Sequence, residues 1–94
     1  MNIRWAESAA AELANIFDYI AFDNENAAIH ILQRIDASIQ RAARMPYSGR
    51  IGRKSGTREI PVPGTPYILV YEIIEETIHI VAILHGAQNW PKSF

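Results

Sequence analysis

The sequence contains no cysteine, and this absence excludes three kinds of chemistry. A disulfide framework, a zinc site with thiolate ligands and a cysteine nucleophile all need this residue. The chain also has no run of about 20 apolar residues, the length that spans a bilayer, and its first residues show no signal-peptide core. We therefore expect a soluble cytoplasmic protein that has no contact with a membrane.

The chain is also too short for two independent cores. It has 94 residues, of which 49% are hydrophobic and 20% are charged. We expect a single domain over residues 1–94, because domains usually have about 100 to 150 residues. A domain of this size has modest stability, and burying further surface against a partner would raise it.

Negative charge is missing from one part of the sequence. Residues 41–58 contain six of the nine Lys and Arg residues and no Asp or Glu, so they carry +6, and the other 76 residues carry −7. A block of one sign favours contact with an anionic partner, either protein or nucleic acid. A solvated loop beside a helix end is the alternative, because cations also favour a helix C-terminus. The candidate binding residues are Arg41, Arg44, Arg50, Arg53, Lys54 and Arg58.

Hydrophobic periodicity predicts two helices. Apolar residues recur every three or four positions over residues 7–22, and again between Asn24, which fits an N-cap, and Pro46. Pro46 ends the second helix, because the residue before a proline is pushed out of the helical region. The result is a helical hairpin whose predicted core residues are Leu13, Ile16, Phe17, Ile20, Leu32, Ile35 and Ile39.

β-branched and aromatic residues predict the strands. Residues 3–5 form a short first strand, and residues 57–62, 67–74 and 77–84 form an antiparallel meander. Residues 46–56 are rich in glycine and serine and predict a loop. The predicted fold class is α+β with the order β-α-α-β-β-β, in which the helical hairpin packs on one face of a small, mainly antiparallel sheet.

The turn at Glu75 and Glu76 predicts the register of the last two strands. A two-residue turn places Ile74 opposite Thr77 and Tyr67 opposite Leu84. The face toward the helices then carries Tyr67, Leu69, Tyr71, Ile73, Ile78, Ile80, Ala82 and Leu84. The other face carries Ile68, Val70, Glu72, Ile74, Thr77, His79, Val81, Ile83 and His85. Because this second face is half apolar, it is a candidate partner surface.

The three histidines do not converge on one metal ion. His79 and His85 lie about 20 Å apart on one predicted strand, and His30 lies on a helix. We expect no metal and no cofactor. His85 either acts as a general acid or base or bonds a carbonyl at the strand end, whereas His79 pairs with Glu72 across the strands. Trp90 either anchors the C-terminal segment or stacks on a base.

Short motifs run through nearly the whole chain: Trp5, residues 16–24, Pro46, Gly49-Arg50, residues 56–59, Pro66-Tyr67-Ile68, Tyr71, residues 84–88 and Trp90. Together they resemble the RelE/ParE superfamily of toxins from bacterial type II toxin–antitoxin modules. The resemblance implies the fold predicted above and a cytoplasmic growth inhibitor. It also implies a cognate antitoxin that wraps the toxin and inactivates it in a hetero-oligomer.

The superfamily divides between ribosome-dependent messenger RNA nucleases and ParE-like toxins that poison DNA gyrase. The nuclease branch places lysines or arginines where this chain has Glu59, Pro61, Ile68 and Gln88. A carboxylate, a proline and an isoleucine cannot donate hydrogen bonds to a developing phosphorane. The resemblance therefore favours gyrase as the target. The alternatives are a metal-independent endoribonuclease, acting on ribosome-bound message with His85 and Arg58 as catalytic residues, and a non-catalytic RNA-binding module.

Overall fold

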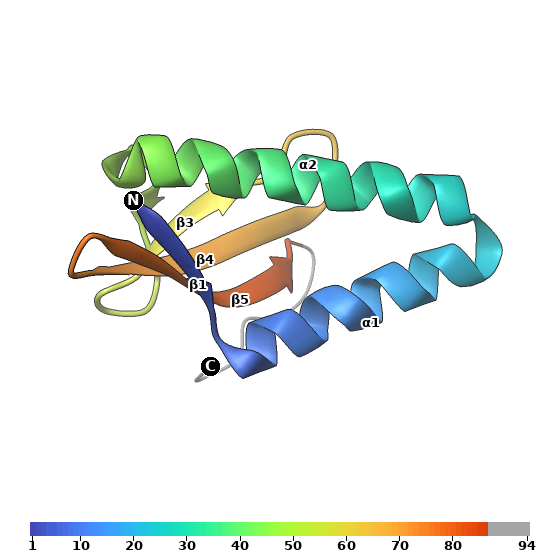
Figure 1. Ribbon diagram of the computed structural model, residues 1–94, viewed down its shortest axis with the longest axis horizontal. Coiled ribbons are helices and arrows are strands. Elements are labelled where there is room, and N and C mark those ends of the chain that lie inside the picture. Colours follow the sequence, from blue (N-terminus) through green and yellow to red (C-terminus); the bar gives the residue numbers. More distant parts are fainter. Residues whose placement is uncertain (87–94) are drawn as a thin grey trace.

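The computed structural model describes residues 1–86, in which two helices pack on one face of a five-stranded sheet (Figure 1). The elements are β1 (Asn2–Trp5), α1 (Glu7–Asp23), α2 (Glu25–Arg44), the 3-10 helix η1 (Pro46–Ser48), β2 (Arg50–Ile51), β3 (Arg58–Pro61), β4 (Tyr67–Ile74) and β5 (Thr77–His85). The predicted α+β fold is confirmed. Neither of the two α-helices in this part of the chain is long and apolar enough to cross a membrane.

Asn24 separates the two helices and caps both of them. Its side chain accepts a hydrogen bond from the backbone N–H of Ala27 at 3.0 Å, which is the N-cap interaction predicted for α2. Its own backbone N–H donates to the carbonyl of Ile20 at the end of α1. One residue therefore satisfies groups at two helix ends, and the hairpin needs no longer connection.

The strand order in the sheet is β1-β5-β4-β3-β2. β1 is parallel to β5, and the other neighbours are antiparallel, so the predicted meander is confirmed. The prediction of a loop over residues 46–56 is only partly correct, because η1 and the edge strand β2 lie within it. Pro61 is paired with β4 but lies beyond the reach of β2, so its missing N–H removes no ladder bond on that side.

A β-bulge changes the register between β4 and β5. Glu75 and Glu76 form the predicted tight turn, with φ of 47° and 61°, and Tyr71 pairs with Ile80. The next pair joins Val70 to Ala82, so the ladder skips Val81. Tyr67 consequently lies opposite His85, and the prediction that it faces Leu84 is wrong.

The bulge also reverses the predicted faces beyond Ile80. Ile83 packs in the main core on the helix side, whereas Ala82 and Leu84 join Val70 in a small cluster on the other face. Val70 and Ala82 are fully buried, and Leu84 is 9% exposed. The prediction of an exposed apolar surface is therefore wrong for this part of the sheet.

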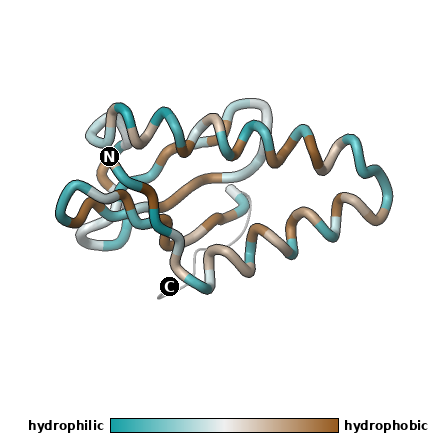
Figure 2. The backbone as a smooth tube through the Cα atoms, viewed as in Figure 1, coloured by the Kyte–Doolittle hydropathy of each residue, from teal (hydrophilic) through white to brown (hydrophobic). Residues whose placement is uncertain are grey.

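The main core lies between the helices and the sheet. Its buried members include Ile35 and Ile39 from α2 and the residues Ile60, Leu69, Tyr71, Ile78, Ile80 and Ile83 from the strands. Hydrophobic and hydrophilic residues alternate along both helices, as Figure 2 shows. The hairpin extends beyond the sheet at its turn (Figure 1). Five of the seven predicted core residues are less buried than expected: Leu13, Ile16, Phe17 and Ile20 are half-buried, and Leu32 is 38% exposed.

Candidate functional site

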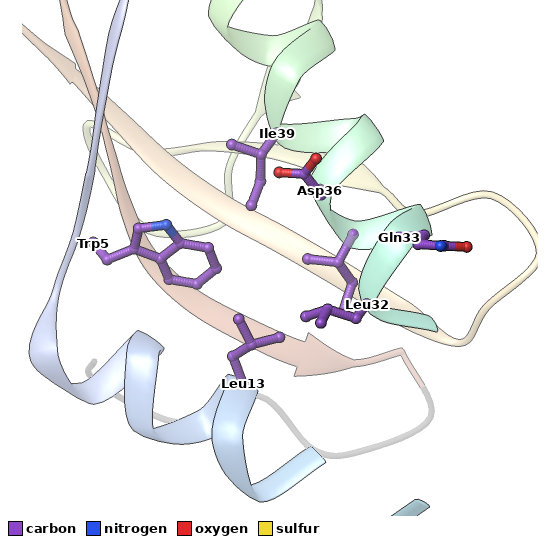
Figure 3. Close-up of a pocket in the computed structure, with 7 residues that line it drawn as sticks. Trp5, Leu13, Leu32, Gln33, Asp36 and Ile39 are labelled. Carbon is purple, nitrogen blue, oxygen red and sulfur yellow. The ribbon is translucent and has the colours of Figure 1, made fainter. Parts of the chain in front are cut away.

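An apolar groove opens between α1, α2 and β1 (Figure 3). Trp5 of β1, Leu13 of α1 and Leu32 of α2 point into one common space. The groove has a volume of about 390 Å³ and is lined by Trp5, Leu13, Leu32, Gln33, Ile35, Asp36 and Ile39. Because the lining is mostly apolar and holds one carboxylate, it suits apolar side chains of a partner better than a chemical reaction.

Glu59 of β3 organises the basic loop. Its side chain is only 1% exposed, and its two oxygens accept from the Arg50 guanidinium at 3.1 Å and from the backbone N–H of Arg53 at 2.9 Å. The guanidinium of Arg53 also lies 3.9 Å from the carboxylate. One carboxylate therefore pairs with two cations of the basic block and offsets one of their two positive charges. The count over residues 41–58 missed this because it ended one residue before Glu59.

Arg58 holds η1 against the sheet. Its Nη1 donates to the carbonyl of Gly49 at 2.7 Å and to that of Tyr47 at 3.3 Å, and its guanidinium lies 5.0 Å from the centre of the Tyr47 ring. Tyr71 fixes the same segment from β4, since its hydroxyl donates to the carbonyl of Pro46 at 2.6 Å. Burial raises the pKa of Tyr71. These contacts give Arg58 a structural role that the amino-acid sequence did not indicate.

His85 lies in a second cleft, between α1 and the ends of β4 and β5. This histidine cleft has a volume of about 610 Å³, and it is lined by Glu12, Asn15, Ile16, Tyr19, Tyr67, Ile83 and His85. The His85 ring meets Tyr67 edge to face, with 5.7 Å between the ring centres. Burial raises the pKa of Glu12, although a hydrogen bond from the backbone of Ile83 opposes this shift.

His85 and Arg58 do not share a site in this structure. His85 lies opposite Tyr67, and Arg58 lies opposite Tyr71. These two tyrosines are four residues apart on β4, which corresponds to about 13 Å along the strand. An acid or base and a phosphate-binding cation must reach the same phosphate. Within residues 1–86, these two candidate residues do not form such a pair.

The remaining predicted residues lie in different places. Arg41 and Arg44 are exposed in the last turn of α2, beside Arg34, which the sequence analysis missed because it lies outside the basic block. Its position seven residues before Arg41 was the available signal. His79 lies opposite Glu72, as predicted. Lys54 lies in the turn between β2 and β3, where its carbonyl accepts from Thr57. Trp90 lies outside the described residues.

No three His, Asp or Glu side chains of residues 1–86 lie close enough together to hold a metal ion. The surface clefts of residues 1–86 include the apolar groove, the histidine cleft and a cleft lined by arginines of α2, and a further cleft is lined by Tyr47, Ile51, Gly56, Thr57, Arg58 and Ile73. The apolar groove and the histidine cleft use different residues of α1: Leu13 lines the first, and Glu12, Asn15, Ile16 and Tyr19 line the second.

Known proteins similar to this chain are toxins. The model of the family described as "ParE toxin of type II toxin-antitoxin system, parDE" matches residues 3–90. The chain is 37% identical over 91 residues to "Putative toxin Y4kP" of Sinorhizobium fredii, covering 97% of this chain and 94% of the relative. It is 31% identical over 87 residues to Toxin RelE2 of Caulobacter vibrioides, covering 93% and 97%.

A solved structure of the chromosomal ParDE toxin–antitoxin system from P. aeruginosa has the same fold. The TM-score is 0.81 at 23% identity, over 90% of this chain and 95% of that one. The family model spans almost all of the sequence, and the relatives match along nearly their full length. The protein therefore belongs to the ParE toxin family of type II toxin–antitoxin systems.

Proposed function

We propose that this protein inhibits growth by acting on DNA gyrase, and that a cognate antitoxin neutralises it by binding in the apolar groove. The observation that carries the choice of target is the separation of His85 from Arg58 on the sheet. A nuclease needs an acid or base and a phosphate ligand at one place. Inhibition of gyrase by binding alone needs no acid or base beside a phosphate ligand.

The positions at which nuclease-like members carry cations support the same choice. Glu59 is a buried acceptor for Arg50 and Arg53, so its carboxylate is committed to the fold. Pro61 ends β3, and Ile68 lies opposite it on β4. None of these three side chains can stabilise negative charge on a phosphate. Gln88 lies outside the described residues.

The shape of the apolar groove supports antitoxin binding there. The groove leaves apolar side chains of three elements open on one side, and Leu32 at its edge is 38% exposed. An amphipathic helix binds such a groove by inserting apolar residues spaced three or four positions apart. Burying Leu32 and Trp5 more fully would also stabilise a domain whose own core is small.

The target is tested by pairing two assays of the purified protein. Gyrase supercoiling is measured together with mapped cleavage of ribosome-bound messages, for the intact protein and for His85→Ala and Arg58→Ala. We expect inhibited supercoiling without cleavage, and His85→Ala should retain this inhibition. Cleavage in the ribosomal A site that either substitution abolishes, with supercoiling untouched, would overturn the gyrase proposal. Circular dichroism separates a loss of activity from unfolding, because Arg58 holds η1 in place.

The binding site of the antitoxin is tested with two matched variants of α2. Leu32 and Ile29 are each 38% exposed, but only Leu32 lines the apolar groove. Leu32→Glu should release growth inhibition in cells that also express the antitoxin encoded beside the toxin, whereas Ile29→Glu should leave neutralisation intact. Equal effects of the two variants would show that the antitoxin binds elsewhere.

A further inference from the structure

Three arginines line a third cleft, on the side of α2 that faces away from the apolar groove. This arginine cleft has a volume of about 310 Å³ and is lined by Arg34, Ala37, Ser38, Arg41, Arg44 and Pro63. Arg34, Ala37, Arg41 and Arg44 follow one another at intervals of three or four, and Ser38 lies four positions after Arg34, so these residues share one helix face. At about 100° per residue, Leu32, Asp36 and Ile39 of the apolar groove point in the opposite direction.

A tight turn holds Arg34 at one end of the cleft. The backbone N–H of Thr65 donates to the carbonyl of Val62 at 3.2 Å, with Pro63 and Gly64 between them, and Gly64 has φ of 75°. This is the pattern of a type II turn. Arg34 donates to the carbonyl of Pro63 at 3.2 Å, and a Cβ on Gly64 would lie 2.5 Å from its guanidinium. The turn therefore positions Arg34 while leaving most of its five N–H donors for a ligand.

The charge of the arginine cleft is not neutralised within the described part of the chain. The ion pairs found there join Glu59 to Arg50 and Arg53, and none involves the arginines of the cleft. The helix dipole favours Arg41 in the last turn of α2, but Arg34 lies ten residues before the end of the helix. Local helix electrostatics therefore do not account for Arg34.

We infer that the arginine cleft binds the carboxylates of an acidic peptide segment that runs along α2. Arg34 and Arg41 are seven residues apart, which is about 10 Å along a helix. Two carboxylates seven residues apart on a partner helix have the same separation. Each guanidinium can hold a carboxylate through two parallel hydrogen bonds, and Ala37 and Pro63 offer an apolar wall to the stem of a glutamate.

A nucleic acid fits the arginine cleft less well than an acidic peptide. Three phosphate contacts give weak binding that salt removes readily, because such binding depends on counterion release. No aromatic side chain is among the lining residues, so bases would have no surface on which to stack. The rest of the sequence carries excess negative charge, which disfavours a long polyanion more than a short peptide.

An acidic segment of the antitoxin would be a natural ligand, and this assignment rests on the proposed function. The antitoxin would then contact two opposite faces of α2, one with apolar side chains and the other with carboxylates. The arginine cleft itself needs neither the apolar groove nor gyrase to bind an acidic peptide. Its test can therefore use the purified protein alone.

The probe is a 16-residue alanine-based helical peptide with two glutamates seven positions apart, and its control carries glutamines there. Binding is measured by fluorescence anisotropy at low salt. The glutamate peptide should bind at least about fivefold tighter than the glutamine peptide, because an exposed ion pair contributes up to about 1 kcal/mol. Arg34→Ala and Arg41→Ala should each weaken binding by about threefold. Arg4→Ala, which removes an exposed arginine of β1, should leave the affinity unchanged.

Two kinds of result would overturn the inference. The first is a lack of discrimination: either the two peptides bind with equal affinity, or Arg34→Ala and Arg4→Ala lose affinity equally. The second is a 16-base-pair DNA duplex that binds more tightly than the glutamate peptide and loses its affinity in Arg34→Ala and Arg41→Ala, which would assign the arginine cleft to nucleic acid. Neither result bears on supercoiling or on the Leu32 and Ile29 variants, so failure here is distinguishable from failure of the proposed function.

Discussion

Replacing Glu59 with glutamine tests whether one buried carboxylate organises the basic loop. Glutamine has nearly the same shape, so the substitution leaves no cavity, but it turns one acceptor oxygen into an NH₂ donor. Both partners of Glu59 are donors: the Arg50 guanidinium at 3.1 Å and the backbone N–H of Arg53 at 2.9 Å. One donor would then face another donor in a place where the side chain is only 1% exposed.

The expected loss of stability is about 2 kcal/mol. A hydrogen bond to a charged group contributes about 1.5 to 3 kcal/mol, and a buried polar group without a partner costs about 1 to 3 kcal/mol. Breaking a fully buried ion pair costs about 3 to 5 kcal/mol, but this range is too high here. The side chains of Arg50 and Arg53 are 64% and 51% exposed, so water can solvate both once the carboxylate is gone.

The assay is urea unfolding of the intact protein, Glu59→Gln and the control Glu75→Gln. Glu75 is an exposed carboxylate in the turn between β4 and β5, so its substitution should change the free energy of unfolding by less than about 0.5 kcal/mol. Hydrogen exchange of residues 50–56 should become faster in Glu59→Gln. A loss no larger than that of the control, with unchanged exchange, would refute the role assigned to Glu59.

Two further substitutions test the core and the histidine cleft. Ile35→Ala should lower the free energy of unfolding by about 2 to 5 kcal/mol, because Ile35 is 1% exposed, whereas Leu32→Ala, one turn earlier at 38% exposure, should lower it by less than about 1 kcal/mol. Equal losses in urea unfolding would show that the phase of α2 is wrong. Glu12→Gln should raise the melting temperature at pH 7. Burial raises the folded-state pKa of Glu12 above its ordinary value of 4.5. The contribution of Glu12 to stability therefore falls as pH rises from 4.5 through the folded-state pKa. The glutamine variant should lack this fall, and parallel pH profiles of the two proteins would contradict the expectation.

The two helices and the antiparallel meander of β3, β4 and β5 follow from local patterns in the sequence. The spacing of apolar residues reports which face of a helix is covered, and Asn24 and Pro46 are local signals for the ends of α2. The turn at Glu75 and Glu76 fixes the first pairs of β4 and β5 because these residues are neighbours in sequence. Such signals need no knowledge of distant parts of the chain, so they were read correctly.

Contacts between distant segments were not predictable in the same way. Glu59 pairs with Arg50 across β2 and β3, and β2 is only two residues long, so no alternation of side chains announces it. Leu32 is 38% exposed because it lies at the open side of the groove between α1, α2 and β1 (Figure 3). Arg34 joins the arginine cleft only because the turn at Pro63 and Gly64 folds back onto α2. In each case the contact or the exposure depends on residues of another strand, helix or turn.

The position of His85 shows how one bulged residue can overturn a prediction of sheet faces from alternating side chains. Alternation assigns faces by counting in steps of two from the turn, so one skipped residue reverses every later assignment. The bulge skips Val81, and Ala82 beside it is also apolar, so the hydrophobic pattern gives no sign of the shift. The shift places Ala82 and Leu84 on the face away from the helices, where both are buried with Val70. The same shift turns His85 toward Glu12 and Tyr67. The surroundings of His85 are therefore set by packing four residues earlier in β5, on the opposite face of the sheet.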